Sequence, residues 1–173
     1  MQELAQTALA TVAASNISAN ERSDRFRRLF VSAFDIPELG KFTLVRHWKT
    51  ATPVQQTTFL KEFEDTQVLT WALRFKNYKG ERVDTRGVTR EGQATWLVDS
   101  LIIRPPSSPV SVQWRVHRAT DGSLRVVDII SVGVSMAQTF RADYASVLQS
   151  NGGNIDGLLS KISAKNEQLA AAP

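Results

Sequence analysis

LRVVDIISVGVSMAQTFRADYASVLQSNGGNIDGLLSKI, residues Leu124–Ile162, contains the change of hydrophobic period that decides the fold. Its first part, Val126–Val132, is an apolar, β-branched run that predicts a strand buried on much of both faces. From Val134 to Leu148, apolar side chains recur every three or four residues, which predicts a helix with one apolar stripe. A strand followed directly by an amphipathic helix indicates a helix that folds back against a sheet.

The end of this stretch predicts a helix stop and a second helix. Gly152–Gly153 can adopt the left-handed backbone geometry that ends helices and that other residues resist. Asn154 or Asp156 can then act as the N-cap of a closing helix. That helix would carry Ile155, Leu158, Leu159 and Ile162 on its apolar face.

The same residues resemble the MlaC, or toluene-tolerance, family of periplasmic phospholipid-binding proteins. The family pattern is roughly an aspartate, a GVS turn, an arginine, an aromatic residue and a GG-(x)-ID-L ending. The matching positions are Asp128, Gly133–Ser135, Arg141, Tyr144 and Gly152–Leu159, with further matches upstream at Phe34–Asp35, Trp48–Lys49, Phe59 and Phe63.

The chain departs from the family pattern at one place. Where the family often has LG-(aromatic)-W, this sequence has VRHW, Val45–Trp48. A basic residue, Arg46, thus replaces a glycine. We expect the local backbone, or the rim of a pocket, to differ there.

Composition excludes several classes of protein. The chain has 173 residues, 42% of them hydrophobic, which suits one globular domain over residues 1–173. The net charge is +4, but Lys and Arg are scattered among Asp and Glu, so we expect no nucleic-acid partner. There is no cysteine, hence no disulfide or thiol chemistry. No run reaches the roughly 18 apolar residues of a membrane span.

The periodicity along the chain predicts helices, then strands, then helices. Residues 3–78 are expected to be helical: a first helix at 3–14, a second capped by Asn20 or Ser23, a third over 38–48 and a fourth from Thr52–Pro53. Antiparallel strands are expected within 81–134 and helices within 135–167. This is an α+β fold in which N-terminal helices and two C-terminal helices pack on one face of a curved antiparallel sheet and enclose an apolar cavity.

The predicted strands lie at 82–90, at 93–104, at Val110–Val116 and in the stretch quoted first. Val110–Val116 alternates strictly between apolar and polar residues and is therefore the clearest strand with one buried face. Thr120–Ser123 has the composition of a hairpin turn between the last two strands.

Catalytic and metal-binding motifs are poorly represented. The two histidines, His47 and His117, fall in different elements, so we expect no metal site and no cofactor. His117 is on the polar face of its strand and is expected to be solvated. Ser135 is better interpreted as a helix N-cap than as a nucleophile, because no G-x-S-x-G elbow surrounds it.

Three acids fall on predicted strands: Asp84, Asp99 and Asp128. Asp128 has aliphatic residues on both sides, and an aspartate in such a run is normally hydrogen-bonded or paired. Its partner could be Arg141, a tyrosine or a tryptophan N–H. The alternative is an enzyme of ketosteroid-isomerase-like fold, in which Asp128 or Asp99 acts as a base on an apolar substrate. A third hypothesis is an interaction domain with a solid core.

A basic helix near the N-terminus is the remaining candidate surface. Arg25 and Arg28 lie beside the apolar stripe of Phe26 and Phe30. The simpler interpretation is an amphipathic helix with its charges in water. The functional interpretation is a surface that meets anionic headgroups or an acidic partner.

The resemblance decides between these hypotheses in favour of a non-catalytic lipid carrier. It implies a periplasmic protein that holds phospholipid acyl chains and shuttles lipid between an outer-membrane lipoprotein complex and an inner-membrane complex attached to an ABC transporter, in the Mla pathway that maintains outer-membrane lipid asymmetry. A hopanoid-like cargo is conceivable. It also implies that an export signal was removed ahead of Met1. The residues expected to contact lipid are Phe42, Trp48, Phe59, Phe63, Leu73, Trp96, Val98, Ile102, Val112, Trp114, Val116, Ile130 and Met136.

Overall fold

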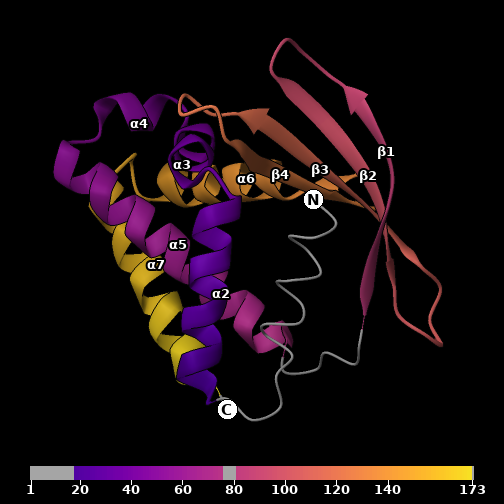
Figure 1. Cartoon of the computed structure of the whole chain (residues 1–173). Coiled ribbons are helices and arrows are strands. Elements are labelled where there is room, and N and C mark those ends of the chain that lie inside the picture. The colour runs from indigo at the N-terminus through magenta and orange to yellow at the C-terminus, as the bar shows by residue number, and fades with distance from the viewer. Residues whose placement is uncertain (1–17, 76–80, 173) are drawn as a thin grey trace. The chain divides into compact units, whose positions relative to one another are not determined.

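The computed structural model describes residues 18–75 and 81–172. The predicted helix at 3–14 lies outside them. Helices come first, then strands, then helices, which confirms the α+β class (Figure 1). The elements are α2 Ala19–Ala33, α3 Ile36–Leu44, α4 Arg46–Thr50, α5 Pro53–Phe75, β1 Arg82–Arg90, β2 Thr95–Ile103, β3 Val110–Arg118, β4 Leu124–Ser131, β5 Val134–Ser135, α6 Met136–Ser150 and α7 Ile155–Ala170.

The described residues form two compact units. The sheet unit comprises residues 18–35, 72–75 and 81–136, and the helical unit comprises residues 36–71 and 137–172. Each unit is described below by itself. The single domain over 1–173 and the apolar cavity enclosed by helices and sheet stay predictions.

The sheet is an antiparallel meander. Its five strands follow the order β1-β2-β3-β4-β5, and each is paired with its neighbour in sequence (Figure 1). The turn predicted at Thr120–Ser123 joins β3 to β4, with Gly122 at φ 81°. Val132 and Gly133 join β4 to β5 with φ values of 50° and 78°, the two positive values that suit the right-handed twist of a hairpin.

Helix α2 begins earlier than predicted, since its cap lies two residues before Asn20 and five before Ser23. Ser18 is its N-cap, because the Ser18 hydroxyl accepts a hydrogen bond from the Glu21 backbone N–H at 3.2 Å. The predicted caps, Asn20 and Ser23, therefore lie within the helix. The helix ends at Ala33, and Phe34 then bridges to Val126 of β4.

The helix predicted over 38–48 is two helices. Val45 separates α3 from α4 with φ 51° and ψ −119°, a conformation that a β-branched residue rarely adopts. Helix α5 begins as predicted at Thr52–Pro53. The Thr52 hydroxyl accepts from the Gln55 N–H at 3.2 Å, and the Gln55 side chain accepts from the Thr52 N–H at 3.0 Å, which is a capping box.

The helical unit has a packed aromatic core. Phe59 and Phe63 on α5 are both 0% exposed, and each makes an edge-to-face contact with Tyr144 of α6. A buried polar contact joins α5 to α7: Thr66 donates to Asn166 at 2.7 Å. Asn166 in turn donates to the Glu62 carbonyl at 3.0 Å, so the core amide is hydrogen-bonded at both ends.

The turn between α6 and α7 matches its prediction. Gly152 and Gly153 have φ values of 68° and 80°, and the Gly153 N–H donates to the Leu148 carbonyl at 2.7 Å. Asn154 is the N-cap of α7, and its side-chain oxygen accepts from the N–H groups of Asp156 and Gly157 at 3.0 and 3.4 Å.

This cap can be tested at a single position. Asn154→Ala removes the acceptor and should lower the free energy of unfolding by about 0.5–2 kcal/mol. Asn154→Asp is the control, because aspartate is an equally good N-cap. Urea unfolding followed by circular dichroism measures both variants. Equal losses in the two variants would contradict the assignment of Asn154 as the cap.

Candidate functional site

One face of the sheet is apolar. Val98, Val112, Val116, Val126 and Ile129 form its buried cluster, and Phe34, Ile102, Val110, Trp114 and Met136 are half-buried around it. The register explains this segregation, since Trp96, Val98 and Ile102 of β2 stand opposite Val116, Trp114 and Val110 of β3. Side chains opposite one another in an antiparallel pair share a face. We call all the side chains named in this paragraph the apolar sheet face.

Trp114 is held in a fixed orientation on this face. Its indole N–H donates to the Ser100 hydroxyl at 2.8 Å, and that hydroxyl donates to the Val112 carbonyl at 3.0 Å. Ser100 is 2% exposed. The polar atom of the indole is therefore satisfied within the sheet, which leaves the ring as an apolar surface.

The opposite face of the sheet carries ion pairs. Asp128, 3% exposed, accepts from Arg115 at 2.8 Å and from the Ser135 hydroxyl at 2.7 Å. An internal pair was predicted for Asp128, and its partner within the sheet unit is Arg115, which the register sets directly across from it. The suggested partners Arg141, a tyrosine and a tryptophan N–H stay predictions. Ser135, which was predicted as a helix N-cap, is the residue immediately before α6.

Arg115 also binds Glu91. Its guanidinium donates two hydrogen bonds to that carboxylate, at 2.7 and 3.1 Å. These bonds lower the pKa of Glu91 and raise the pKa of Arg115. Because the pKa of Glu91 is lower in the folded protein, the pair stabilises the fold above the ordinary pKa of a glutamate. That contribution is lost as the pH falls through the lowered pKa.

The other strand acids also have partners. Asp99 accepts from the Gln113 amide at 2.7 Å, and Asp84 pairs with Arg86 at 2.9 Å. Among residues 18–75 and 81–172, no three His, Cys, Asp or Glu side chains are grouped to hold a metal ion. The strand acids thus have structural partners that account for their positions.

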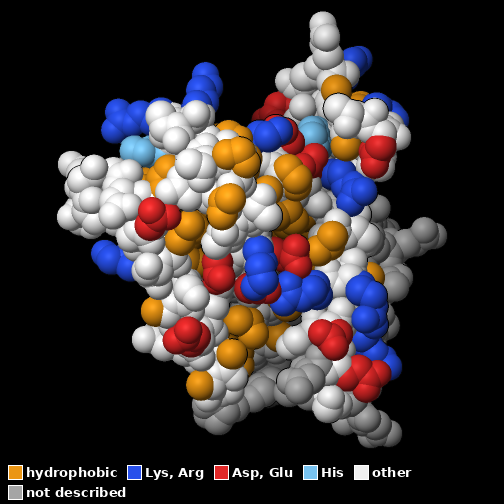
Figure 2. All heavy atoms as spheres, turned by 90° about the vertical axis from the view of Figure 1, so that its left-hand side faces the viewer, with side chains coloured by type: hydrophobic (Ala, Val, Ile, Leu, Met, Phe, Trp, Pro, Cys, Tyr) orange, Lys and Arg blue, Asp and Glu red, His pale blue; other side chains and the backbone are white. Residues whose placement is uncertain are grey.

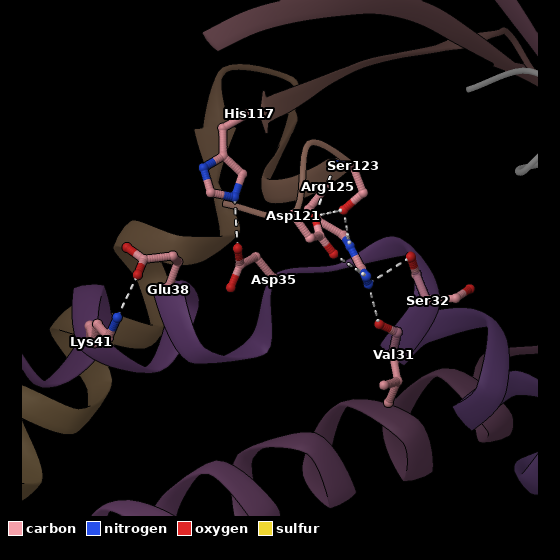
Figure 3. Close-up of polar contacts among 9 residues, drawn as sticks. All are labelled: Val31, Ser32, Asp35, Glu38, Lys41, His117, Asp121, Ser123 and Arg125. Atoms are coloured by element: carbon pink, nitrogen blue, oxygen red, sulfur yellow. Dashed lines mark hydrogen bonds and ion pairs between the residues drawn. The ribbon is translucent and has the colours of Figure 1, made fainter. Parts of the chain in front are cut away.

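His117 and Arg125 fasten the end of α2 to the sheet (Figure 3). His117 was predicted to be solvated, but its Nε2 lies 2.8 Å from the Asp35 carboxylate, with 23% of the side chain exposed. Arg125 donates to the carbonyls of Val31 and Ser32, both at 2.9 Å. The Asp35 N–H also donates to the Val126 carbonyl at 3.0 Å.

The helical unit contains a pocket of about 840 Å³. The end of α3, the start of α4, α6 and the glycines after α6 line it. Its charged and titratable lining residues are Arg46, His47 and Arg141. We call it the arginine pocket. Sequence analysis did not predict it, although Arg46 marked the place where the family pattern is broken.

The predicted lipid-contacting residues divide among several environments. The apolar sheet face holds Trp96, Val98, Ile102, Val112, Trp114 and Val116, with Met136 packed against its cluster. Ile130 stands opposite Gln113 and so lies on the other face. Leu73 is half-buried near the end of α5.

Four of the predicted residues belong to the helical unit. Phe59 and Phe63 lie in its packed core. Phe42 on α3 is 38% exposed, with the Arg141 guanidinium 5.5 Å from the centre of its ring. Trp48 is half-buried on α4. A role in lipid contact stays a prediction for all thirteen.

Charges of both signs are mixed on one face of the protein (Figure 2). On the face drawn in Figure 2, acidic and basic side chains are intermixed, and hydrophobic side chains are exposed between them. No helix within residues 18–75 and 81–172 is long and apolar enough to cross a membrane.

Two comparisons bear on these surfaces. A family model described as MlaC protein matches residues 2–164. Among solved structures, the chain is similar to a phospholipid-binding protein from Ralstonia solanacearum, determined in complex with a phospholipid. The TM-score is 0.83 at 23% sequence identity, and the match covers 98% of each chain.

The Asp128 pair can be tested against a second carboxylate on the same face. Asp128→Asn removes a buried charge and leaves Arg115 partly unpaired, so it should lower the free energy of unfolding by about 3–5 kcal/mol. Asp99→Asn is the matched control, because its partner is a neutral amide, and should cost about 0.5–1.5 kcal/mol. Chemical denaturation measures both. A variant of Asp128 as stable as the parent would show that the pair is not structural.

Proposed function

Because the chain belongs to the MlaC family, we propose that it binds phospholipid and carries it through the periplasm between membrane complexes. The observation that carries the proposal is the apolar sheet face, in a chain whose family model matches residues 2–164. The phospholipid complex of the Ralstonia solanacearum protein, which has a similar fold, supports the same class of ligand.

The physical need for such a carrier follows from the cost of exposing an acyl chain to water. Burial of one CH₂ group contributes roughly 0.8 kcal/mol, so a chain of about 16 carbons costs on the order of 12 kcal/mol in water. A protein that removes this surface from water lets a lipid leave one membrane and reach another. Transfer is then an exchange of lipid between binding sites, and it needs no catalytic group.

The apolar sheet face suits acyl chains rather than a polar substrate. Its half-buried members, including Ile102, Val110, Trp114 and Met136, are large and carry no unsatisfied polar atom, since the Trp114 N–H is bonded to Ser100. The ion pairs of the sheet are on its other face. A chain of CH₂ groups can therefore contact this surface without leaving a charge unpaired.

The partners follow from the proposed route. An outer-membrane lipoprotein complex would exchange lipid with the protein at one membrane, and an inner-membrane substrate-binding complex attached to an ABC transporter would do so at the other. Phospholipid is the proposed cargo, with no other cofactor.

Native mass spectrometry tests the proposal directly. The protein is purified without detergent and its mass is measured before and after solvent extraction, and the extract is analysed for lipids. We expect a mass difference equal to a phospholipid that appears in the extract. A hopanoid in its place would change the cargo. Protein that never carries lipid, even after incubation with phospholipid vesicles, would overturn the proposal.

A substitution on the apolar sheet face should reduce lipid binding. Trp114→Arg places a charge where an acyl chain would lie, so the co-purified lipid should fall several-fold while the protein stays folded. Ser111→Arg is the control, because Ser111 is an exposed residue of the same strand that faces the other way. Circular dichroism checks folding. Loss of folding in Trp114→Arg would instead place the residue in a solid core.

The arginines of α2 should affect transfer and not binding. Arg25 and Arg28 are off the buried stripe, and Arg25 pairs with Glu21 at 2.6 Å on the surface. Changing both to Glu should leave the melting temperature and the bound lipid nearly unchanged. Transfer to anionic acceptor vesicles should slow, most at low salt, where charges are least screened.

The matched control replaces Lys161 and Lys165, two exposed cations of α7, with Glu. This variant has the same change of net charge. Slower transfer in the α2 variant alone would support a docking role for that helix. Equal rates for both variants and the parent across a salt series would show that the α2 arginines are simply solvated.

A further inference from the structure

The arginine pocket is built from three segments of the helical unit. Val45 separates α3 from α4 and Arg46 and His47 begin α4, Arg141 comes from α6, and Gly152 and Gly153 come from the turn after α6. The pocket has a volume of about 840 Å³, within the range of pockets that hold small molecules. It is therefore large enough for more than a bound water or a single ion.

The electrostatics of this pocket favour an anion. Among the residues that the structure describes, its lining contains Arg46, Arg141 and His47 and no aspartate or glutamate. The Arg141 guanidinium lies 5.5 Å from the centre of the Phe42 ring, and within residues 18–75 and 81–172 it pairs with no carboxylate. By contrast, Arg25, Arg86 and Arg115 each pair with an acid elsewhere in the chain. Arg141 thus keeps its N–H donors for a ligand.

Arg46 also keeps donors for a ligand. Its Nε donates to His47 Nε2 at 3.4 Å, which leaves the two terminal nitrogens of the guanidinium available. The bond also orients the imidazole, whose Cε1 lies beside Gly153, 3.5 Å from where a Cβ would be. Because Gly153 has no side chain, it leaves room for the His47 ring at this side of the pocket.

The backbone at the pocket is strained. Val45 has φ 51° and ψ −119°, although its side chain is β-branched and 43% exposed. Such conformations cost about 1–3 kcal/mol and cluster at binding sites, where they set the direction of neighbouring side chains. Here the strained residue immediately precedes Arg46 and His47. Arg46 is also the basic residue that stands where the family pattern often has glycine.

The hydrogen-bond donors and the apolar lining residues of the pocket indicate the class of ligand that it can bind. Guanidinium groups bind phosphate oxygens through paired N–H donors, and two such groups suit a phosphate better than a single carboxylate. Leu44 and Leu148 add apolar wall beside them. We propose that the arginine pocket binds a phosphate ester, supplied either by a lipid headgroup or by a free phosphorylated molecule. The inference does not depend on acyl-chain binding by the apolar sheet face.

Titration calorimetry with three probes tests the proposal. The probes are inorganic phosphate, glycerol 3-phosphate, and dihexanoyl-phosphatidylglycerol below its micellar concentration, each at fixed ionic strength. The variants are Arg46→Gln and Arg141→Gln, and the control is Arg104→Gln, an exposed arginine in the sheet unit. Each pocket variant should weaken binding by about tenfold or more, because it removes charge-assisted hydrogen bonds. The control should leave affinity unchanged.

The three probes distinguish the sources of the phosphate. Arginine-dependent binding of glycerol 3-phosphate supports a free phosphate ester as the ligand. Arginine-dependent binding of the short-chain lipid alone supports a headgroup. Binding of none of the probes, or equal weakening by Arg104→Gln, would overturn the proposal.

A second measurement covers variants that fail to fold. Amide chemical shifts of the parent protein are followed during addition of glycerol 3-phosphate and of the short-chain lipid. The N–H groups of Arg46, His47, Gly152 and Gly153 should shift with one saturating curve. Shifts spread over the whole chain, or none at these four residues, would contradict the assignment.

Discussion

The pairing of β3 with β4 is the constraint on which the sheet unit depends. The turn at Thr120–Ser123 brings the strands together, and a bulge between Arg115 and Val116 then shifts their register. Because of this shift, Asp128 faces Arg115 on one side of the sheet, while Val126 and Ile129 both reach the other side. The bulge thus places the ion pairs on one face of the sheet and the apolar side chains on the other.

The helical unit depends on a different device, the close packing of aromatic rings. Phe59 and Phe63 are fully buried against Tyr144, and Phe140 stacks on Tyr144 and meets Phe63 edge to face. Such a core holds helices rigidly, so short turns between helices can adopt conformations that are unfavourable by themselves. The turn at Val45 is of this kind. The packed core and the strained turn together give a rigid frame in which the arginine pocket is formed.

Much of the fold follows from local sequence, whereas the site depends on register and on distant contacts. Most elements were predicted from hydrophobic patterns of period two and period 3.6, together with the helix start at Thr52–Pro53 and the helix stop at Gly152–Gly153. The partner of Asp128 was missed because counting back from the turn sets Arg115 opposite Val127, and a bulge leaves no local signal. His117 was expected in solvent because Asp35, its partner, is 82 residues away. The arginine pocket joins three segments that share no motif.

The capping of α2 by Arg125 couples elements that are far apart along the chain. The two carbonyls that this guanidinium binds are 94 and 93 residues from it. Helix α2 thus obtains its last partners only after β4 has formed, so its completion is a late, non-local event in folding. In hydrogen exchange, the final turn of α2 and the start of β4 would then open as one cooperative unit. The final turn of α2 thus depends on β4 for its stability, although α2 itself is a helix.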